Sequence, residues 1–257
     1  MYVNLLAIFF IQLFCIGIMI NSLQQTNIYN IRRPVTFKGL TPFNKLPEIA
    51  ILSGIPSSFT ETMVKRIQQF PPHLLDKVKN DEWKIILANN FEDALVHAKI
   101  PIELFRESIS SLTPDIKRLN AMLLNVHDGI KPIKLVIYPH LPDVINNPGA
   151  VNHELCHVII RTDNLLDDPH VINCFLEDLQ KLNPQKMDKI DNYYFSGVIQ
   201  PTQRGSLDEV TAECIAWQCP GGGVYGNHCL NEPYRPDFVK NYFPKTFNLI
   251  KNRYFNK

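Results

Sequence analysis

The segment His153-Glu154-Leu155-Cys156-His157 combines two histidines and a glutamate with the spacing of a hydrolytic metal site. On a helix, His153 and His157 lie one turn apart on the same face, so both imidazoles can reach one ion at about 2.0–2.1 Å. Glu154 is rotated by roughly 100° from His153, so it does not bind the ion but can hold a water molecule on it. The segment predicts a site for one Zn²⁺ ion, with Glu154 as the general base.

A third protein ligand is needed, because a catalytic zinc site uses three protein ligands and keeps one position for water. The best candidate is Glu209, since Ser206 followed by Glu209 is a capping-box pattern that predicts the start of a helix. Glu213 lies one turn further along the same face, where it can accept the N–H of a ligating histidine and fix its tautomer. His170 and His228 stay open as other third ligands.

The elements that must position these side chains follow from hydrophobic periodicity and from helix-breaking prolines. The segment around His153 predicts a helix from about Ala150 to Arg161, and the segment around Glu209 predicts one from Ser206 to Gln218. The other predicted elements are a helix capped by Thr60, a short helix from Pro72, a strand at Trp83–Ala88, helices at Phe91–His97, Ile102–Ser108 and Pro114–Val126, a strand at Ile133–Tyr138, and helices at Val171–Leu182 and Pro244–Tyr254. Together they predict a helix-rich α+β fold with a small β-sheet.

The composition excludes two classes of protein. The chain has 257 residues, with 26 Lys and Arg against 25 Asp and Glu, so its net charge of +1 gives no electrostatic case for a nucleic-acid binder. Hydrophobic residues make up 45 % and charged residues 20 %, which is ordinary globular usage and excludes disorder for most of the chain.

The N-terminus differs from the rest, because no charged side chain precedes Arg32. The apolar run Leu5–Ile20 is shorter than the roughly 20 residues that span a bilayer, so it predicts a secretory signal peptide, residues 1–22, with a short uncleaved anchor as the alternative. An extended, proline-punctuated lead-in is predicted for residues 23–57, and a single domain for residues 58–257. The protein is therefore expected to be secreted, or anchored with this domain outside.

The cysteines leave two interpretations open. The chain has 6 Cys, of which Cys15 would leave with the signal peptide, so an odd number remains. Two disulfides with one free thiol fit an oxidising compartment, and Cys219 with Cys229 is the favoured pair because they flank the glycine-rich segment Pro220–Gly223. Alternatively, all of the remaining cysteines are small buried side chains.

The segment His153–His157, followed by Asp208-Glu209-Val210-Thr211-Ala212-Glu213, resembles the zinc-peptidase domain of anthrax lethal factor and of the secreted Pro-Pro endopeptidases. Similar segments also stand at Phe70–Leu75 with Trp83–Leu87 and at Phe243–Ile250, so the resemblance covers roughly residues 58–254. It implies a zincin-like domain of the gluzincin type, with Glu209 as the third ligand and Glu213 beside it. It also implies peptide substrates with proline near the cleaved bond.

The chain departs from that family at three places. Cys156 stands where the family usually has glycine. Thr202 stands seven residues before the ligand Glu, where the family has a catalytic tyrosine, and Tyr193 or Tyr194 could replace that tyrosine only if the chain has an insertion. The long spacing between the two motifs is consistent with an inserted loop around residues 200–205.

These observations predict a secreted zinc metalloendopeptidase that binds a protein or peptide substrate, with no nucleic-acid partner and no stable membrane span after signal cleavage. One alternative is a catalytically inactive, secreted toxin-like or binding protein that keeps a structural zinc site. Such a site is closed by a fourth protein ligand, for which Cys156 and His228 are candidates. Threonine instead of tyrosine at position 202 favours this inactive alternative. A zinc peptidase of another lineage, such as a thermolysin-like one, is the second alternative.

Overall fold

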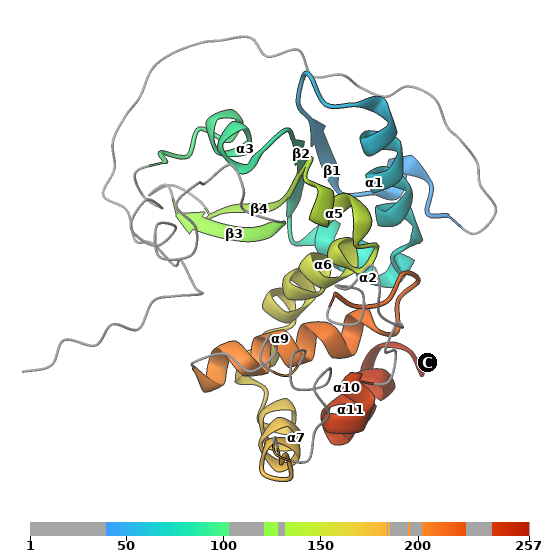
Figure 1. The fold of residues 1–257 in the computed structure, drawn as a ribbon, viewed down its shortest axis with the longest axis vertical. Coiled ribbons are helices and arrows are strands. Elements are labelled where there is room, and N and C mark those ends of the chain that lie inside the picture. Colours follow the sequence, from blue (N-terminus) through green and yellow to red (C-terminus); the bar gives the residue numbers. More distant parts are fainter. Residues whose placement is uncertain are drawn as a thin grey trace, which may run out of the picture.

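The computed structural model describes residues 40–102, 121–127, 132–183, 185, 195, 202–224 and 238–256. Figure 1 shows a sheet with its covering helices in one half of the molecule and a group of helices in the other. Helix α6 (Gly149–Thr162), which carries the His-Glu-x-x-His segment, lies where the two halves meet. The described residues form the helix-rich α+β fold with a small sheet that the sequence predicts.

Four strands form a mixed sheet in the order β1-β2-β4-β3. Their bounds are β1 Glu48–Ile51, β2 Lys84–Ala88, β3 Met122–His127 and β4 Pro132–Pro139. β1, β2 and β4 are parallel, with Ile86 opposite Ile137, whereas β3 runs antiparallel to β4. The central strands β2 and β4 are largely apolar because side chains on both of their faces are buried.

Alternate residues of β2 point to opposite faces of the sheet, and each face has its own hydrophobic cluster. Ile85 and Leu87 belong to the larger cluster, together with side chains of α1 (Ser57–Gln69), α2 (Pro72–Asn80) and α6. Ile86 and Ala88 belong to the smaller cluster, together with α3 (Phe91–His97). The sheet therefore supports α6 on one face and α3 on the other. Two short elements complete this half: the 3₁₀ helix η1 (Phe43–Lys45) and helix α5 (Pro142–Asn146).

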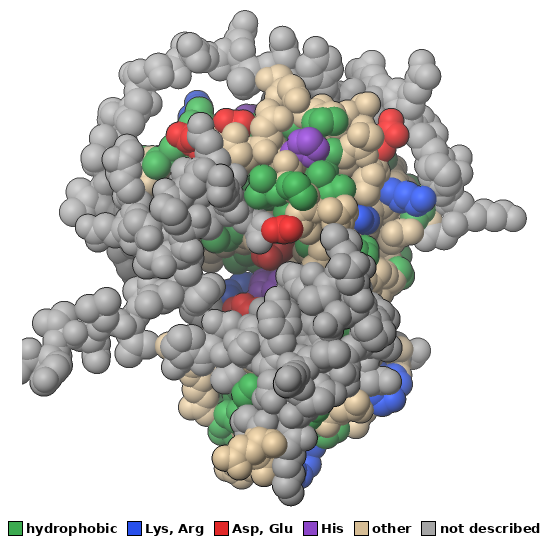
Figure 2. Space-filling model, viewed as in Figure 1, with side chains coloured by type: hydrophobic (Ala, Val, Ile, Leu, Met, Phe, Trp, Pro, Cys, Tyr) green, Lys and Arg blue, Asp and Glu red, His purple; other side chains and the backbone are tan. Residues whose placement is uncertain are grey.

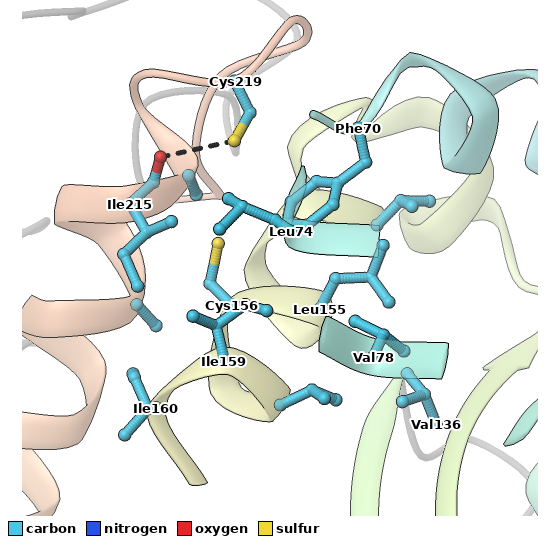
Figure 3. Close-up of a cluster of buried hydrophobic side chains, with 14 of the residues drawn as sticks. Phe70, Leu74, Val78, Val136, Leu155, Cys156, Ile159, Ile160, Ile215 and Cys219 are labelled. Atoms are coloured by element: carbon cyan, nitrogen blue, oxygen red, sulfur yellow. Dashed lines mark hydrogen bonds between the residues drawn. The ribbon is translucent and has the colours of Figure 1, made fainter. Parts of the chain in front are cut away.

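The second half consists of helices that gather around the other side of α6. They are η3 (Leu165–Asp167), α7 (Pro169–Leu179), α9 (Gln203–Ala216), α10 (Phe238–Tyr242) and α11 (Pro244–Tyr254). Helix α9 packs along α6, and α11 contacts both α7 and α9. Figure 3 shows Cys156 and Ile159 of α6 between Leu74 of α2 and Ile215 of α9. Apolar contacts on two sides thus hold α6 in place.

A buried carboxylate fixes the last helix. Asp178 of α7 accepts hydrogen bonds from the backbone N–H groups of Lys245 and Thr246, at 3.2 and 2.8 Å, and from the Thr246 hydroxyl at 2.9 Å. These N–H groups belong to the first turn of α11, where they have no partner inside the helix. The carboxylate therefore caps α11 from a neighbouring helix.

Several predicted elements are confirmed. The helices predicted at Phe91–His97 and Pro244–Tyr254 have the observed bounds of α3 and α11. The helix predicted from Pro72 is α2, which places proline in its first turn, where a missing N–H costs nothing. The strands predicted at Trp83–Ala88 and Ile133–Tyr138 correspond to β2 and β4.

The helix predicted at Pro114–Val126 is wrong where the structure describes it. Residues 122–127 form strand β3, which pairs with β4 from Met122 opposite Ile137 to His127 opposite Pro132. This pairing with a buried strand is a tertiary contact that outweighs the local preference for helix. The predicted lead-in also contains a strand, because β1 pairs with β2.

Both predicted helix caps are also wrong. Thr60 lies inside α1 and is buried, since that helix begins at Ser57 directly after Pro56. Ser206 lies inside α9, because the side chain of Thr202 accepts the N–H of Gly205 at 3.0 Å and starts the helix at Gln203. Thr202 is thus an N-cap residue.

The predicted signal peptide, residues 1–22, and nearly all of the helix predicted at Ile102–Ser108 lie outside the described residues. Among the helices that are described, none has the length and apolar character needed to cross a bilayer.

Candidate metal centre

The two histidines of α6 face each other at the junction of the two halves. The Nε2 atoms of His153 and His157 are 3.0 Å apart, and both residues are nearly buried, with 6 and 7 % of their surface exposed. The first turn of α6 is fixed by the hydroxyl of Tyr138, which donates to the carbonyl of Val151 at 3.0 Å. The strand β4 therefore anchors the helix just before the histidines.

Glu209 of α9 completes the group. One of its carboxylate oxygens lies 3.3 Å from Nε2 of His153, and the other lies 3.7 Å from Nε2 of His157. Donor atoms that bind one tetrahedral ion at about 2.0–2.1 Å are roughly 3.3–3.4 Å apart. The three observed separations bracket this value, so the predicted ligands gather at a spacing that fits a zinc ion. That they bind zinc stays a prediction.

The far sides of both imidazoles contact carboxylates. Nδ1 of His153 lies 2.6 Å from Glu213, and Nδ1 of His157 lies 3.1 Å from Asp208. An ionised carboxylate only accepts hydrogen bonds, so we assign the imidazole protons to the Nδ1 atoms. The two Nε2 lone pairs then converge on one point together with the Glu209 carboxylate. This arrangement is unfavourable without a cation and suits one well.

The sequence predicted Glu213 beside a ligand but missed Asp208. Asp208 is almost buried and is held by the guanidinium of Arg161, which donates to its two carboxylate oxygens at 3.0 and 2.8 Å. Two signals were present: Asp208 directly precedes Glu209, and Arg161 follows His157 by one helical turn.

The charges of the site suit a cation. Burial acts to raise the pKa of Asp208, but His157 and Arg161 outweigh it and hold that pKa far below its ordinary value. Burial likewise acts to raise the pKa of Glu209, but the two histidines lower it. Both carboxylates are therefore ionised at neutral pH.

The pKa values of the two histidines are raised instead. Burial acts to lower the pKa of His153, but Glu209 and Glu213 raise it well above its ordinary value. Burial also acts to lower the pKa of His157, but Asp208 and Glu209 raise it. In both cases the neighbouring carboxylates stabilise positive charge at this place, whether that charge is a proton or a metal ion.

Glu154, the predicted general base, is half-buried on α6 beside His153. Burial is the main cause that raises its pKa, to about 7. A carboxyl group with a pKa near neutrality can both accept and release a proton, as general acid–base catalysis requires.

The other candidate residues do not join this group. His170 lies at the start of α7, and its side chain is not part of the metal-site group found among the described residues. The thiol of Cys156 is buried in the larger hydrophobic cluster, on the side of Cys219 (Figure 3). His228, Tyr193 and Tyr194 lie outside the described residues.

The cysteines described by the structure form no disulfide with one another. Cys156, Cys174, Cys214 and Cys219 all have free thiols. The favoured pair, Cys219 with Cys229, is therefore not formed: the thiol of Cys219 instead donates to the carbonyl of Ile215 at 3.4 Å, and Cys229 lies outside the described residues.

The surface is hollowed at this junction. Figure 2 shows a recess between the sheet-containing half and the helical half, with histidine and acidic side chains visible at its floor. The nearly buried metal-site group lies at the same junction in the fold, between α6 and α9.

No protein-family model and no curated protein matches the chain. Among solved structures, a Pro-Pro endopeptidase from Paenibacillus alvei is similar, with a TM-score of 0.47 and 15 % identity, over 82 % of this chain and 98 % of that one. The predicted resemblance to lethal factor stays a prediction.

Proposed function

We propose that the protein is a zinc-dependent endopeptidase. The observation that carries this proposal is the convergence of His153, His157 and Glu209 on one point, with each imidazole backed by a carboxylate. His153, His157 and Glu209 match in number and type the three protein ligands of a catalytic zinc site. The position of Cys156 in the hydrophobic core also speaks against its use as a fourth ligand.

In peptide hydrolysis, the zinc ion and the side chains of the protein would have separate roles. A zinc ion held by His153, His157 and Glu209 would polarise the carbonyl of the scissile bond and lower the pKa of its water toward about 7. Glu154 takes a proton from the attacking water and passes it to the leaving amine. Asp208 and Glu213 hold the imidazoles in orientation, so that neither ring has to reorganise when the ion binds.

A peptide is the substrate class that the fold accommodates best. Strand β3 is an edge strand of the described sheet, and it lies against α6. An extended peptide can add to such an edge through backbone hydrogen bonds and so lie beside the metal-site helix. The proposal also includes a preference for proline near the cleaved bond, which only the resemblance to the Pro-Pro endopeptidases implies, and secretion, which the apolar N-terminal segment predicts.

Substitution of Glu154 by glutamine tests this function. The amide keeps the size of the side chain but cannot take up the proton, so Glu154→Gln should keep its zinc and lose peptide cleavage, by about 100-fold or more. A peptide library enriched in proline, read by mass spectrometry, supplies the substrates. Cleavage by the variant at the wild-type rate would refute the role of Glu154. Failure of the zinc-loaded wild type to cleave any member would favour the inactive, zinc-binding alternative.

A further inference from the structure

The glycine-rich turn Pro220–Val224, which follows α9, packs against the carboxylate of Glu213. This carboxylate also contacts His153. Gly221 and Gly222 have φ angles of +97° and +70°, which glycine adopts without strain, and they turn the chain back toward α9. Directly after the turn, the backbone N–H of Val224 donates to Oε1 of Glu213 at 3.0 Å. The same oxygen lies 2.6 Å from Nδ1 of His153. The turn and the predicted zinc ligand therefore share one acceptor atom.

Where the turn packs against α6 and α9, neither Gly223 nor Gly149 has room for a side chain. A Cβ atom on Gly223 would lie 2.0 Å from Oε2 of Glu213, and a Cβ atom on Gly149 would lie 2.1 Å from the carbonyl oxygen of Gly223. The backbone of Gly223 thus fits between the Glu213 carboxylate and the first residue of α6. Glu213 is completely buried, and both of its oxygens are confined by this arrangement.

Helix α6 itself holds the turn. Asn152 is 2 % exposed, and its side-chain amide donates to the carbonyl oxygens of Pro220 and Gly222 at 2.8 and 2.9 Å. Asn152 directly precedes His153, so one helix supplies both a predicted ligand and the group that fastens the turn. The contacts form a closed path from Asn152 through the turn to Glu213 and back to His153.

We propose that Asn152 is a positioning residue for the metal site, acting through the turn Pro220–Val224 and Glu213. This inference rests on the proposed function, because it takes His153 to be a zinc ligand. A buried carboxylate can orient an imidazole only if its own rotamer is fixed, and the turn fixes it. Asn152 holds the turn in place with a donor that neither aspartate nor alanine can supply.

The experiment measures the affinity for Zn²⁺ by competition with a chromophoric chelator, at one pH, for the full chain. Asn152→Asp keeps the size of the side chain but replaces the donor with an oxygen that faces two carbonyl oxygens. We expect zinc affinity to fall by about tenfold, which is the lower end of the range for loss of a residue that supports a metal ligand through hydrogen bonds. Asn152→Ala removes the donor without that repulsion, so it provides the same test if Asn152→Asp does not fold.

Two comparisons separate positioning from a loss of stability. Thr246→Val removes a buried hydroxyl that donates to Asp178 in the helical half, so it should lower the melting temperature and leave zinc affinity unchanged. The double variant Asn152→Asp with Glu213→Ala should bind zinc no more weakly than Glu213→Ala alone, within about twofold, because interacting residues are non-additive.

The outcomes are distinct. Unchanged zinc affinity in folded Asn152 variants overturns the positioning role, and so does an Asn152→Asp effect that persists in full in the Glu213→Ala background. A wild-type protein that takes up no Zn²⁺ overturns the proposed function, and the positioning role with it. A tenfold loss that disappears in the Glu213→Ala background supports the proposal.

Discussion

Removal of the Asp208 carboxylate should weaken zinc binding through His157. In Asp208→Ala, Nδ1 of His157 loses a partner at 3.1 Å, and Arg161 loses two short hydrogen bonds to the same carboxylate. Loss of a group behind a metal ligand typically costs 10–100-fold in affinity, which is about 1.4–2.7 kcal/mol. We expect the loss here to lie in that range, because the contact is nearly buried and therefore poorly replaced by water.

The assay is zinc competition against a chelator, with circular dichroism to show that the variant is folded. Asp208→Asn is the matched variant, because its amide oxygen can still accept the proton of Nδ1, so it should lose less affinity than Asp208→Ala. Glu48→Ala is the control: it breaks the exposed ion pair between Glu48 of β1 and Lys84 of β2, and it should leave zinc affinity unchanged. Wild-type affinity in folded Asp208→Ala would refute the role assigned to Asp208.

Two further predictions concern the scaffold. Asp178→Ala leaves the N–H groups and hydroxyl at the start of α11 without their acceptor, so the free energy of unfolding should fall by about 1–3 kcal/mol in a urea titration, while zinc affinity stays unchanged; an unaltered midpoint would contradict the capping role. Burial acts to raise the pKa of Asp81, but hydrogen bonds from Lys134, Thr162 and Trp83 lower it. Ionised Asp81 therefore stabilises the fold at pH values above its ordinary pKa, and this contribution is lost as the pH falls through the lowered pKa of the folded state. Asp81→Asn should therefore be less stable than wild type at neutral pH, with the difference shrinking toward pH 3 in thermal melts; a difference that is independent of pH would contradict this assignment.

The parts of the site that depend on local spacing could be predicted from the sequence. His153 and His157 lie four residues apart on one helix, and Glu209 and Glu213 repeat that spacing on another, so the helical period alone places each pair on one face. Asp208 could not be assigned in the same way. Its role depends on Arg161, which lies on the other helix, and therefore on how α6 packs against α9.

The same distinction explains the errors in the fold. Helices α2, α3 and α11 begin at a proline or at a clear break in periodicity, so their bounds follow from nearby residues. Strand β3 was predicted as helix because its short apolar segment gains its conformation from pairing with β4. The start of α9 does not follow from the local pattern, because Thr202 and Ser206 are both suitable caps and only Thr202 is used.

The zinc content of the purified protein tests the central claim most directly. Inductively coupled plasma mass spectrometry should find about one zinc ion per chain in the wild type, held by three protein ligands, and far less in His153→Ala. Circular dichroism would show that the variant keeps its fold. A wild-type protein that is purified without zinc, and that takes up none from added Zn²⁺, would contradict the assignment of His153, His157 and Glu209 as a metal site.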